Sequence, residues 1–206
     1  MKHISIVWFI PAFALLLPGL QAWEYTALSE EHRSVLESGE AVIFSSRPDD
    51  GAEPDQRFVT AGRLITGSRD LIWEVLNDKE DAEDYVDGIL DSEVLEEEGN
   101  VLTVKQRTHV GGPKGAYTYT LRYVLTPKSK TEFFYLGGEI KNVTGAWWIF
   151  DGPDESTFLV VYALHIDPGV FAPRFVIKQG QKKSMPGTLI SMEREVKRRQ
   201  VESKSE

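Results

Sequence analysis

Segment 116–166 consists of short runs in which apolar and polar residues alternate, separated by turn-forming residues. A period of two residues is typical of β-strands that are buried on one face. The strands predicted here are 116–125, 132–136, 143–150 and 157–166. Eleven of the chain's 22 aromatic residues lie between Tyr117 and Tyr162, so the sheet has a large apolar face. That face has to be covered, by a packed core or by a bound apolar molecule.

The residues before this segment predict a helix and a strand, followed by the start of the main domain. Ser29 has the side chain of a helix N-cap and precedes two acidic residues, so a short helix is expected. Ser68 is a second N-cap, for a helix whose Ile72, Val75 and Leu76 share one face. The predicted elements are a helix at 29–36, strands at 40–46 and 58–66, helices at 69–76 and 81–90, and a hairpin of strands 90–95 and 101–110.

The C-terminal region 171–201 has the composition of a helix, with Gly180 and Pro186-Gly187 inside it. Because proline disrupts a helix interior, we expect a short helix, a bend near Pro186 and a longer helix through Arg199. Consecutive strands joined by short turns form an antiparallel sheet. The sequence therefore predicts an α+β fold in which a long C-terminal helix packs on the concave face of an antiparallel sheet.

The inward face of that sheet gives the candidate binding residues. In the strand 116–125, Tyr117, Tyr119 and Tyr123 share one face with two leucines, and polar residues share the other. Trp147 and Trp148 are adjacent, so one points inward and the other outward, and the sequence does not decide which. Trp147 is favoured as the inward residue because Ile149 shares its side, whereas Phe150 shares the side of Trp148. The side chains expected to line an internal cavity are Gln106, Tyr117, Tyr119, Tyr123, Phe134, Trp147, Ile149, Tyr162 and Leu164.

Several of these inward side chains carry a hydrogen-bonding atom. Burying such an atom without a partner costs roughly 1–3 kcal/mol. One interpretation is that the hydroxyls of Tyr119, Tyr123 and Tyr162 and the amide of Gln106 bond to one another or to the backbone. The other is that they contact the polar head of a ligand. The sequence leaves both open.

Three motifs resemble the START/Bet v 1-like (SRPBCC) superfamily, and specifically its coenzyme Q-binding and polyketide cyclase-like branch. The opening I-x-A/G-x-x-x-x-V-W-x-V-L-x-D pattern is matched from Ile65 to Asp78, with Ile72 where the pattern has valine. Gly138 to Trp147 resembles the later G-x-x-x-x-x-x-G-x-W strand pair, and Tyr162 to Gly169 resembles the strand exit. The resemblance implies a helix-grip fold, a seven-stranded antiparallel sheet wrapped round a long C-terminal helix with a cavity between them. Relatives bind lipids, sterols, quinones or polyketides, and some are cyclases.

The N-terminal residues have the pattern of a cleaved export signal. Lys2 and His3 precede an apolar run from Ile4 to Leu20, and Ala22 is a suitable cleavage residue. An uncleaved membrane anchor is the alternative, although two prolines interrupt the short run. The expected organisation is a signal peptide at 1–22, a helix-and-strand lead-in at 23–56, the START-like domain at 57–200 and a disordered tail at 201–206. The localisation expected is periplasmic or secreted.

Composition excludes several classes of function. The chain has no cysteine, so disulfides, thiolate nucleophiles and cysteine-ligated metals are absent. Its four histidines are not in a metal-binding spacing, and no cofactor motif is present. A net charge of −9 argues against nucleic-acid binding. The basic residues Lys178, Lys182 and Lys183 of the last helix are candidates for transient contact with anionic lipid headgroups.

We therefore expect an exported, monomeric, non-enzymatic carrier or sensor of a hydrophobic small molecule. A first alternative is a cyclase- or hydrolase-like enzyme that uses tyrosine hydroxyls, Gln106 or His165 in the same cavity. That alternative requires two or more titratable groups to converge there. A second alternative is a cell-envelope interaction domain without ligand, with an exposed apolar patch that includes the outward-facing tryptophan of the 147–148 pair.

Overall fold

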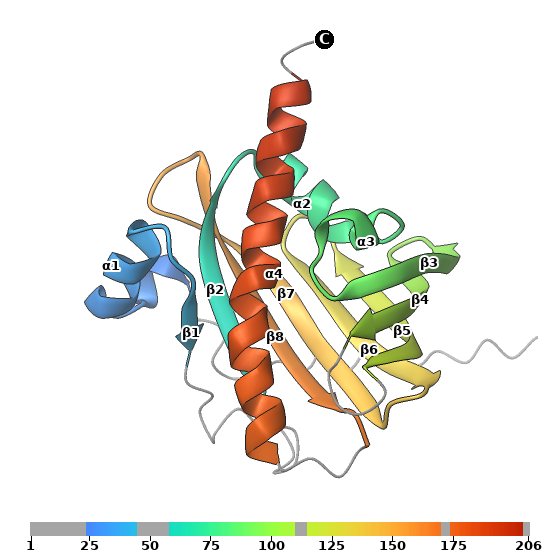
Figure 1. Cartoon of the computed structure of the whole chain (residues 1–206). Coiled ribbons are helices and arrows are strands. Elements are labelled where there is room, and N and C mark those ends of the chain that lie inside the picture. Colours follow the sequence, from blue (N-terminus) through green and yellow to red (C-terminus); the bar gives the residue numbers. More distant parts are fainter. Residues whose placement is uncertain (1–23, 45–57, 110–114, 170–173, 204–206) are drawn as a thin grey trace, which may run out of the picture.

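The computed structural model describes residues 24–44, 58–109, 115–169 and 174–203. One antiparallel sheet has the strand order β1-β2-β8-β7-β6-β5-β4-β3, and the helix α4 crosses its inner face (Figure 1). This is the predicted α+β helix-grip fold. The predicted signal peptide at 1–22, residues 23 and 45–56 of the lead-in and residues 204–206 of the predicted tail lie outside the described residues.

The helices and strands follow one another in the predicted order, with the short helix η2 in addition. The helices are η2 (Tyr25–Ala27), α1 (Glu30–Glu37), α2 (Arg69–Asn77), α3 (Ala82–Tyr85) and α4 (Arg174–Glu202). The strands are β1 (Val42–Phe44), β2 (Val59–Thr66), β3 (Ile89–Glu98), β4 (Val101–His109), β5 (Ala116–Thr126), β6 (Lys130–Gly138), β7 (Asn142–Asp151) and β8 (Thr157–Asp167).

Both predicted N-caps are confirmed. The Ser29 hydroxyl accepts a hydrogen bond from the backbone N–H of His32, and the Ser68 hydroxyl accepts one from Leu71, each at 3.2 Å. These bonds satisfy N–H groups that the first turn of a helix leaves without a partner. In α2 the apolar face packs inward as predicted, with Ile72, Val75 and Leu76 all buried.

The helix predicted at 81–90 is much shorter in the structure. α3 ends at Tyr85, and Ile89 already belongs to β3. Gly88 has a φ of +94°, a conformation that turns the chain out of the helix and into the strand. The Tyr85 hydroxyl donates to the carbonyl oxygens of Val75 at 2.6 Å and Asp78 at 3.0 Å, which fixes α3 against the end of α2.

The sheet has eight strands rather than seven. β1, from the lead-in, pairs with β2 in the register Val42↔Gly62 and extends the sheet at that edge. The lead-in is therefore part of the same folded unit. Its residues Tyr25, Leu28 and Leu36 pack with Trp148 and the outward side chains of β8 in a second apolar cluster.

This second cluster removes the exposed patch expected for an interaction domain. Trp147 belongs to the inner core, as predicted, and Trp148 to the cluster on the opposite face. Trp148 is only 5% exposed because the lead-in covers it. The sequence did not show this cover, because the apolar residues of the lead-in are few and widely spaced.

The predicted bend at Pro186 is wrong, since α4 is one continuous helix. Buried Met185, Leu189, Met192 and Val196 recur on one face of it and pack against the sheet and α2. This packing outweighs the local cost of the proline. The helix also continues through Val201 and Glu202, two residues into the tail that was expected to be disordered.

Candidate functional site

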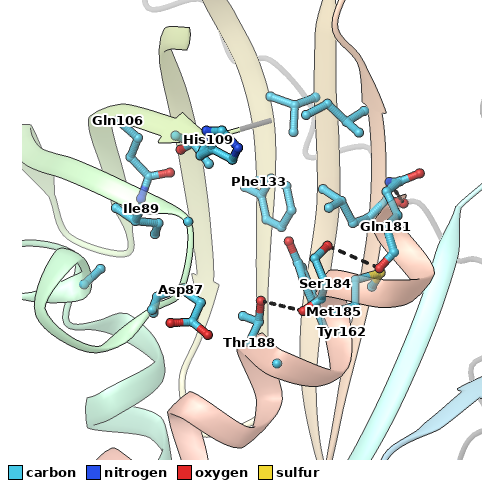
Figure 2. A pocket seen from close by; sticks show the side chains of 18 of the residues that line it. Asp87, Ile89, Gln106, His109, Phe133, Tyr162, Gln181, Ser184, Met185 and Thr188 are labelled. Atoms are coloured by element: carbon cyan, nitrogen blue, oxygen red, sulfur yellow. Dashed lines mark hydrogen bonds between the residues drawn. The ribbon is translucent and has the colours of Figure 1, made fainter. Parts of the chain in front are cut away.

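A cavity of about 740 Å³ lies between the inner face of the sheet and α4. The segment from the end of α2 to the start of β3 forms another of its walls. Figure 2 shows side chains of β4, β6, β8 and α4 directed around this space. Its interior is mainly apolar and aromatic, and Asp87, His109, Ser184 and Thr188 are polar residues at its less buried side.

Six of the nine predicted side chains line this cavity. They are Gln106, Tyr119, Tyr123, Trp147, Tyr162 and Leu164. Tyr117, Phe134 and Ile149 do not line it. Tyr117 is buried at the start of β5, opposite Thr108 of β4. Ile149 is buried in the packed core near α2, and its carbonyl oxygen accepts a hydrogen bond from Arg69 Nη1 at 2.8 Å.

Phe134 is replaced at the cavity by its neighbour Phe133. In the β5–β6 register, Phe133 pairs with inward-facing Tyr123, and Phe134 pairs with Arg122 on the other face. Two adjacent aromatic residues in β6 gave no sequence signal for which one points inward. The register decides it, because directly paired residues share a face.

A glycine makes room for the Phe133 ring. A Cβ atom at Gly145 would lie 2.4 Å from Cζ of Phe133 and 2.2 Å from the carbonyl oxygen of Ala163. With no side chain at Gly145, the ring can lie over β7. Phe133 then contacts Tyr123 on one side and Tyr162 on the other, with ring centres 5.7 and 6.4 Å apart. Tyr162 stacks on Trp147 at 3.8 Å, which completes a row of four rings along the cavity wall.

Two of the inward tyrosines bond to protein groups, as the first interpretation of the sequence expected. The Tyr119 hydroxyl donates to Thr108 at 2.9 Å. The Tyr123 hydroxyl donates to Gln106 at 3.3 Å, and the Gln106 amide donates to Ser92 at 3.3 Å. Burial raises the pKa of both tyrosines, so their hydroxyls are neutral at pH 7.

Tyr162 differs from them. Its hydroxyl makes no hydrogen bond to any residue that the structure describes, and the residue lines the cavity. Burial raises its pKa as well, with a smaller contribution from nearby Tyr119. The Tyr162 hydroxyl is therefore a neutral polar group available to a molecule in the cavity.

A lysine that the sequence did not single out lies in the cavity wall. Lys79 follows α2, is 7% exposed and lines the cavity. Its Nζ atom donates a hydrogen bond to the carbonyl oxygen of Leu76 and lies 4.6 Å from the centre of the Tyr123 ring. Burial lowers the pKa of Lys79 to about 7, and the neighbouring Asp78 charge opposes that shift. The one feature of the sequence that distinguishes Lys79 is that it is the single basic residue among the acidic residues from Asn77 to Glu98.

His165, a candidate from the sequence, and His109 lie in different places. His165 is on the face of β8 opposite the cavity, where its ring packs edge-on against Phe58 at 6.0 Å. His109 ends β4 and lines the cavity at an exposed position (Figure 2). Within the described residues, no group of three or more potential metal ligands occurs and no helix has the length and apolarity to cross a bilayer.

Residues 65–193 match the family model described as "polyketide cyclase / dehydrase and lipid transport". The chain belongs to this family. The resemblance to START/SRPBCC proteins seen in the sequence is therefore confirmed. No curated protein matches the sequence.

Solved structures share the fold at low sequence identity. The Zhui aromatase/cyclase from Streptomyces sp. R1128 is 22% identical, with a TM-score of 0.62 over 70% of this chain and 95% of that one. The STAR-related lipid transfer protein from Xanthomonas axonopodis is 14% identical, with a TM-score of 0.61 over 76% and 98%. Human StAR-related lipid transfer protein 5 is 10% identical, with a TM-score of 0.63 over 78% and 88%. These similarities establish the helix-grip fold.

Proposed function

We propose that this protein is an exported carrier or sensor that holds a hydrophobic small molecule between the sheet and α4, without chemical change. The observation that carries the proposal is the cavity of about 740 Å³, which the aromatic side chains line but do not fill. Ligand pockets in proteins span roughly 300–1,000 Å³ and are mostly apolar with a few polar groups. The structural similarity to two lipid transfer proteins supports the same function.

The physical driving force is the removal of apolar surface from water. Water in this cavity contacts mainly aromatic and aliphatic side chains such as Phe133, Trp147 and Leu164. A ligand that buries about 300 Å² of its own apolar surface gains roughly 7 kcal/mol before the costs of ordering are subtracted. A lipid-like molecule therefore suits the site, and a small hydrophilic metabolite does not.

Chemical analysis of the bound molecule tests this proposal. Protein purified without detergent is extracted with organic solvent, and the extract is analysed by mass spectrometry. The extracted molecule is then incubated with fresh protein and analysed again. A carrier returns the molecule unchanged. A product that accumulates beyond one equivalent would overturn the non-enzymatic function.

An enzyme is the second candidate, and one observation favours it. Lys79, Tyr123 and Gln106 converge on one part of the cavity, which meets the requirement that titratable groups with shifted pKa values lie together. A lysine with a pKa near 7 can exchange a proton at neutral pH. The similarity to an aromatase/cyclase agrees with this candidate. If product forms in the incubation above, its rate should fall in Lys79→Met and Tyr123→Phe.

Export completes the proposal. Residues 1–22 would direct the chain across a membrane and be removed after Ala22. Cell fractionation followed by N-terminal sequencing tests this step. A mature chain that begins at Trp23 in the exported fraction supports export, and a membrane-bound chain with an intact N-terminus supports the anchor instead.

Contact with a membrane surface would deliver the ligand. Lys183 lines the cavity and is exposed, and Lys182 beside it is exposed as well. Anionic headgroups attract such residues. Co-sedimentation with phosphatidylserine vesicles should decrease in a Lys182→Gln/Lys183→Gln double variant. Equal binding of the two proteins would remove these lysines from the proposal.

A further inference from the structure

We infer that Lys79 forms an anion-binding subsite inside the cavity, and that the ligand is an amphiphile with a carboxylate head and an apolar body. This inference rests on the proposed function, because it names the class of molecule that the cavity holds. It is carried by the position of the Lys79 amine, by the charges around it and by the row of aromatic rings beside it.

The Lys79 amine is placed inside the cavity wall by two elements. It follows α2, and its Nζ atom donates to the Leu76 carbonyl oxygen in the last turn of that helix. Its other neighbour is the face of the Tyr123 ring, at 4.6 Å. A carbonyl oxygen and an aromatic face both attract a cation, but neither carries a full negative charge. The amine therefore has partial stabilisation without a counterion.

The neighbouring acids do not neutralise it. Asp78, which precedes Lys79 in the chain, forms an ion pair with Arg199 of α4 at 2.5 Å. None of the ion pairs found among the described residues includes Lys79. Other charged or titratable groups on the surrounding elements are Tyr85 of α3, Asp87, His109 of β4, Tyr119 and Tyr123 of β5, Tyr162 of β8, and Lys183, Glu195 and Arg199 of α4.

These surroundings favour an anionic group on the ligand. Glu195 is held by Arg198 and Arg199, and the tyrosines are neutral. Two carboxylates line the cavity: Asp78 is paired with Arg199, and Asp87 is exposed to solvent and forms no ion pair with Lys79 among the described residues. A carboxylate brought in by the ligand would supply that partner in a site where opposite charges interact more strongly than in water.

The rest of the ligand would follow the aromatic row. Tyr123 lies next to Lys79, and Phe133, Tyr162 and Trp147 continue the wall from there. The Tyr162 hydroxyl offers a further hydrogen bond to the head or to an oxygen on the body of the ligand. This arrangement places the acidic end of the molecule near α2 and its apolar part over Phe133.

A carboxylate also changes the protonation of the lysine. Because the pKa of Lys79 is near 7, its amine is mostly neutral at pH 8 when the cavity holds no anion. Pairing with a carboxylate favours the charged form, so binding should take up a proton from solution. A neutral ligand of the same size should bind without proton uptake.

Calorimetric titration with a matched pair of ligands tests the inference. Delipidated protein is titrated at pH 8 with decanoate and with decanol, each in phosphate and in Tris, whose ionisation enthalpies differ. For the natural sequence we expect uptake of close to one proton per decanoate and none per decanol. Lys79→Met should bind decanoate at least 10-fold more weakly and decanol no more weakly. The control Lys105→Met removes the same charge from an exposed position on β4 and should leave both affinities unchanged.

The outcomes separate the inference from the function on which it rests. If decanol and decanoate both bind and decanoate takes up no proton, the anion-binding subsite is overturned and the hydrophobic cavity site stands. If Lys79→Met and the natural sequence bind decanoate with equal affinity, the anion-binding subsite is likewise overturned and the hydrophobic cavity site stands. If neither ligand binds to the natural sequence, the proposed function fails as well. Proton uptake is measured on the unsubstituted protein, so the test does not depend on the folding of a variant.

Discussion

Arg199 of α4 forms an ion pair with Asp78 at the end of α2, with 2.5 Å between Nη2 and Oδ2. The same guanidinium donates to Glu195 at 2.7 Å and to Glu74 at 3.2 Å. These contacts fasten the C-terminal part of α4 to the residue that precedes Lys79. Arg199 therefore adds a polar link between α4 and the end of α2 to the apolar packing of α4 on the sheet, and it holds the residue next to the cavity lysine.

Substitution of Arg199 should destabilise the fold. Arg199→Met leaves Asp78 without its partner and Glu195 with Arg198 alone, in a region where these side chains are mostly buried. We expect a loss of roughly 1–3 kcal/mol in the free energy of unfolding, measured by urea denaturation at pH 7. The matched control is Arg194→Met, an exposed position on the same helix, which should stay within about 0.5 kcal/mol. Equal effects of the two would mean that the Arg199 contacts do not stabilise the fold.

Substitution of Lys79 should stabilise the ligand-free protein at low pH. Folding lowers the pKa of Lys79 from its ordinary value of 10.5 to about 7, so between these values the unfolded chain holds a proton that the folded chain has released. The free energy of unfolding of the natural sequence therefore rises with pH across this window. Lys79→Met should be more stable by up to roughly 4 kcal/mol below pH 7, with a difference that shrinks toward pH 10.

Urea unfolding at pH 6.5, 8 and 9.5 measures this difference, with Lys105→Met as the control. A gain that does not change with pH would show that the lysine is not neutralised by folding. Together with the calorimetric experiment, the result would separate the cost of burying the amine from its use in binding.

The packing of Phe133 over Gly145 predicts a steric effect. Gly145→Ala places a methyl group against both the Phe133 ring and the Ala163 carbonyl oxygen, and the backbone oxygen cannot move freely. We expect a loss of about 1–3 kcal/mol and weaker ligand binding, because the ring is forced toward the cavity. Gly137→Ala is the control, since its added Cβ has no neighbour within 4 Å. Unchanged stability of Gly145→Ala would contradict the close approach of ring and strand.

Pro186 offers a gain in stability. It lies inside α4, where proline removes a backbone hydrogen bond donor and strains the preceding turn. Pro186→Ala should raise the free energy of unfolding by roughly 1–3 kcal/mol, as followed by thermal or urea unfolding. A loss of stability would indicate that the proline ring makes contacts that outweigh this cost.

Much of the architecture follows from local patterns in the sequence. The caps Ser29 and Ser68 and the alternation in β5 and β8 are each visible over a few residues. The predictions were wrong where contacts between residues far apart in the sequence determine the local structure. Pro186 stays helical because the buried face of α4 packs on the sheet, and the lead-in joins the sheet because β1 pairs with β2.

Among the cavity residues, too, some could be predicted from local sequence patterns and others depend on distant contacts. Strand alternation identified Tyr119, Tyr123 and Tyr162, since each occupies an inward position in a regular strand. It could not choose between Phe133 and Phe134, because the answer depends on the register with β5. It also missed Lys79, which lies between two helices in a stretch of acids and turns inward only because α2 and α3 cover the cavity there.

Native mass spectrometry of protein purified without detergent tests the central claim most directly. We predict a complex of one chain with one small hydrophobic molecule. Thr188→Trp, which adds a large side chain to the cavity wall, should lose this molecule, whereas Gln179→Trp, at an exposed position of the same helix, should retain it. The contradicting result would be a spectrum of the natural sequence that shows the mass of the bare chain alone, both as purified and after exposure to a lipid extract.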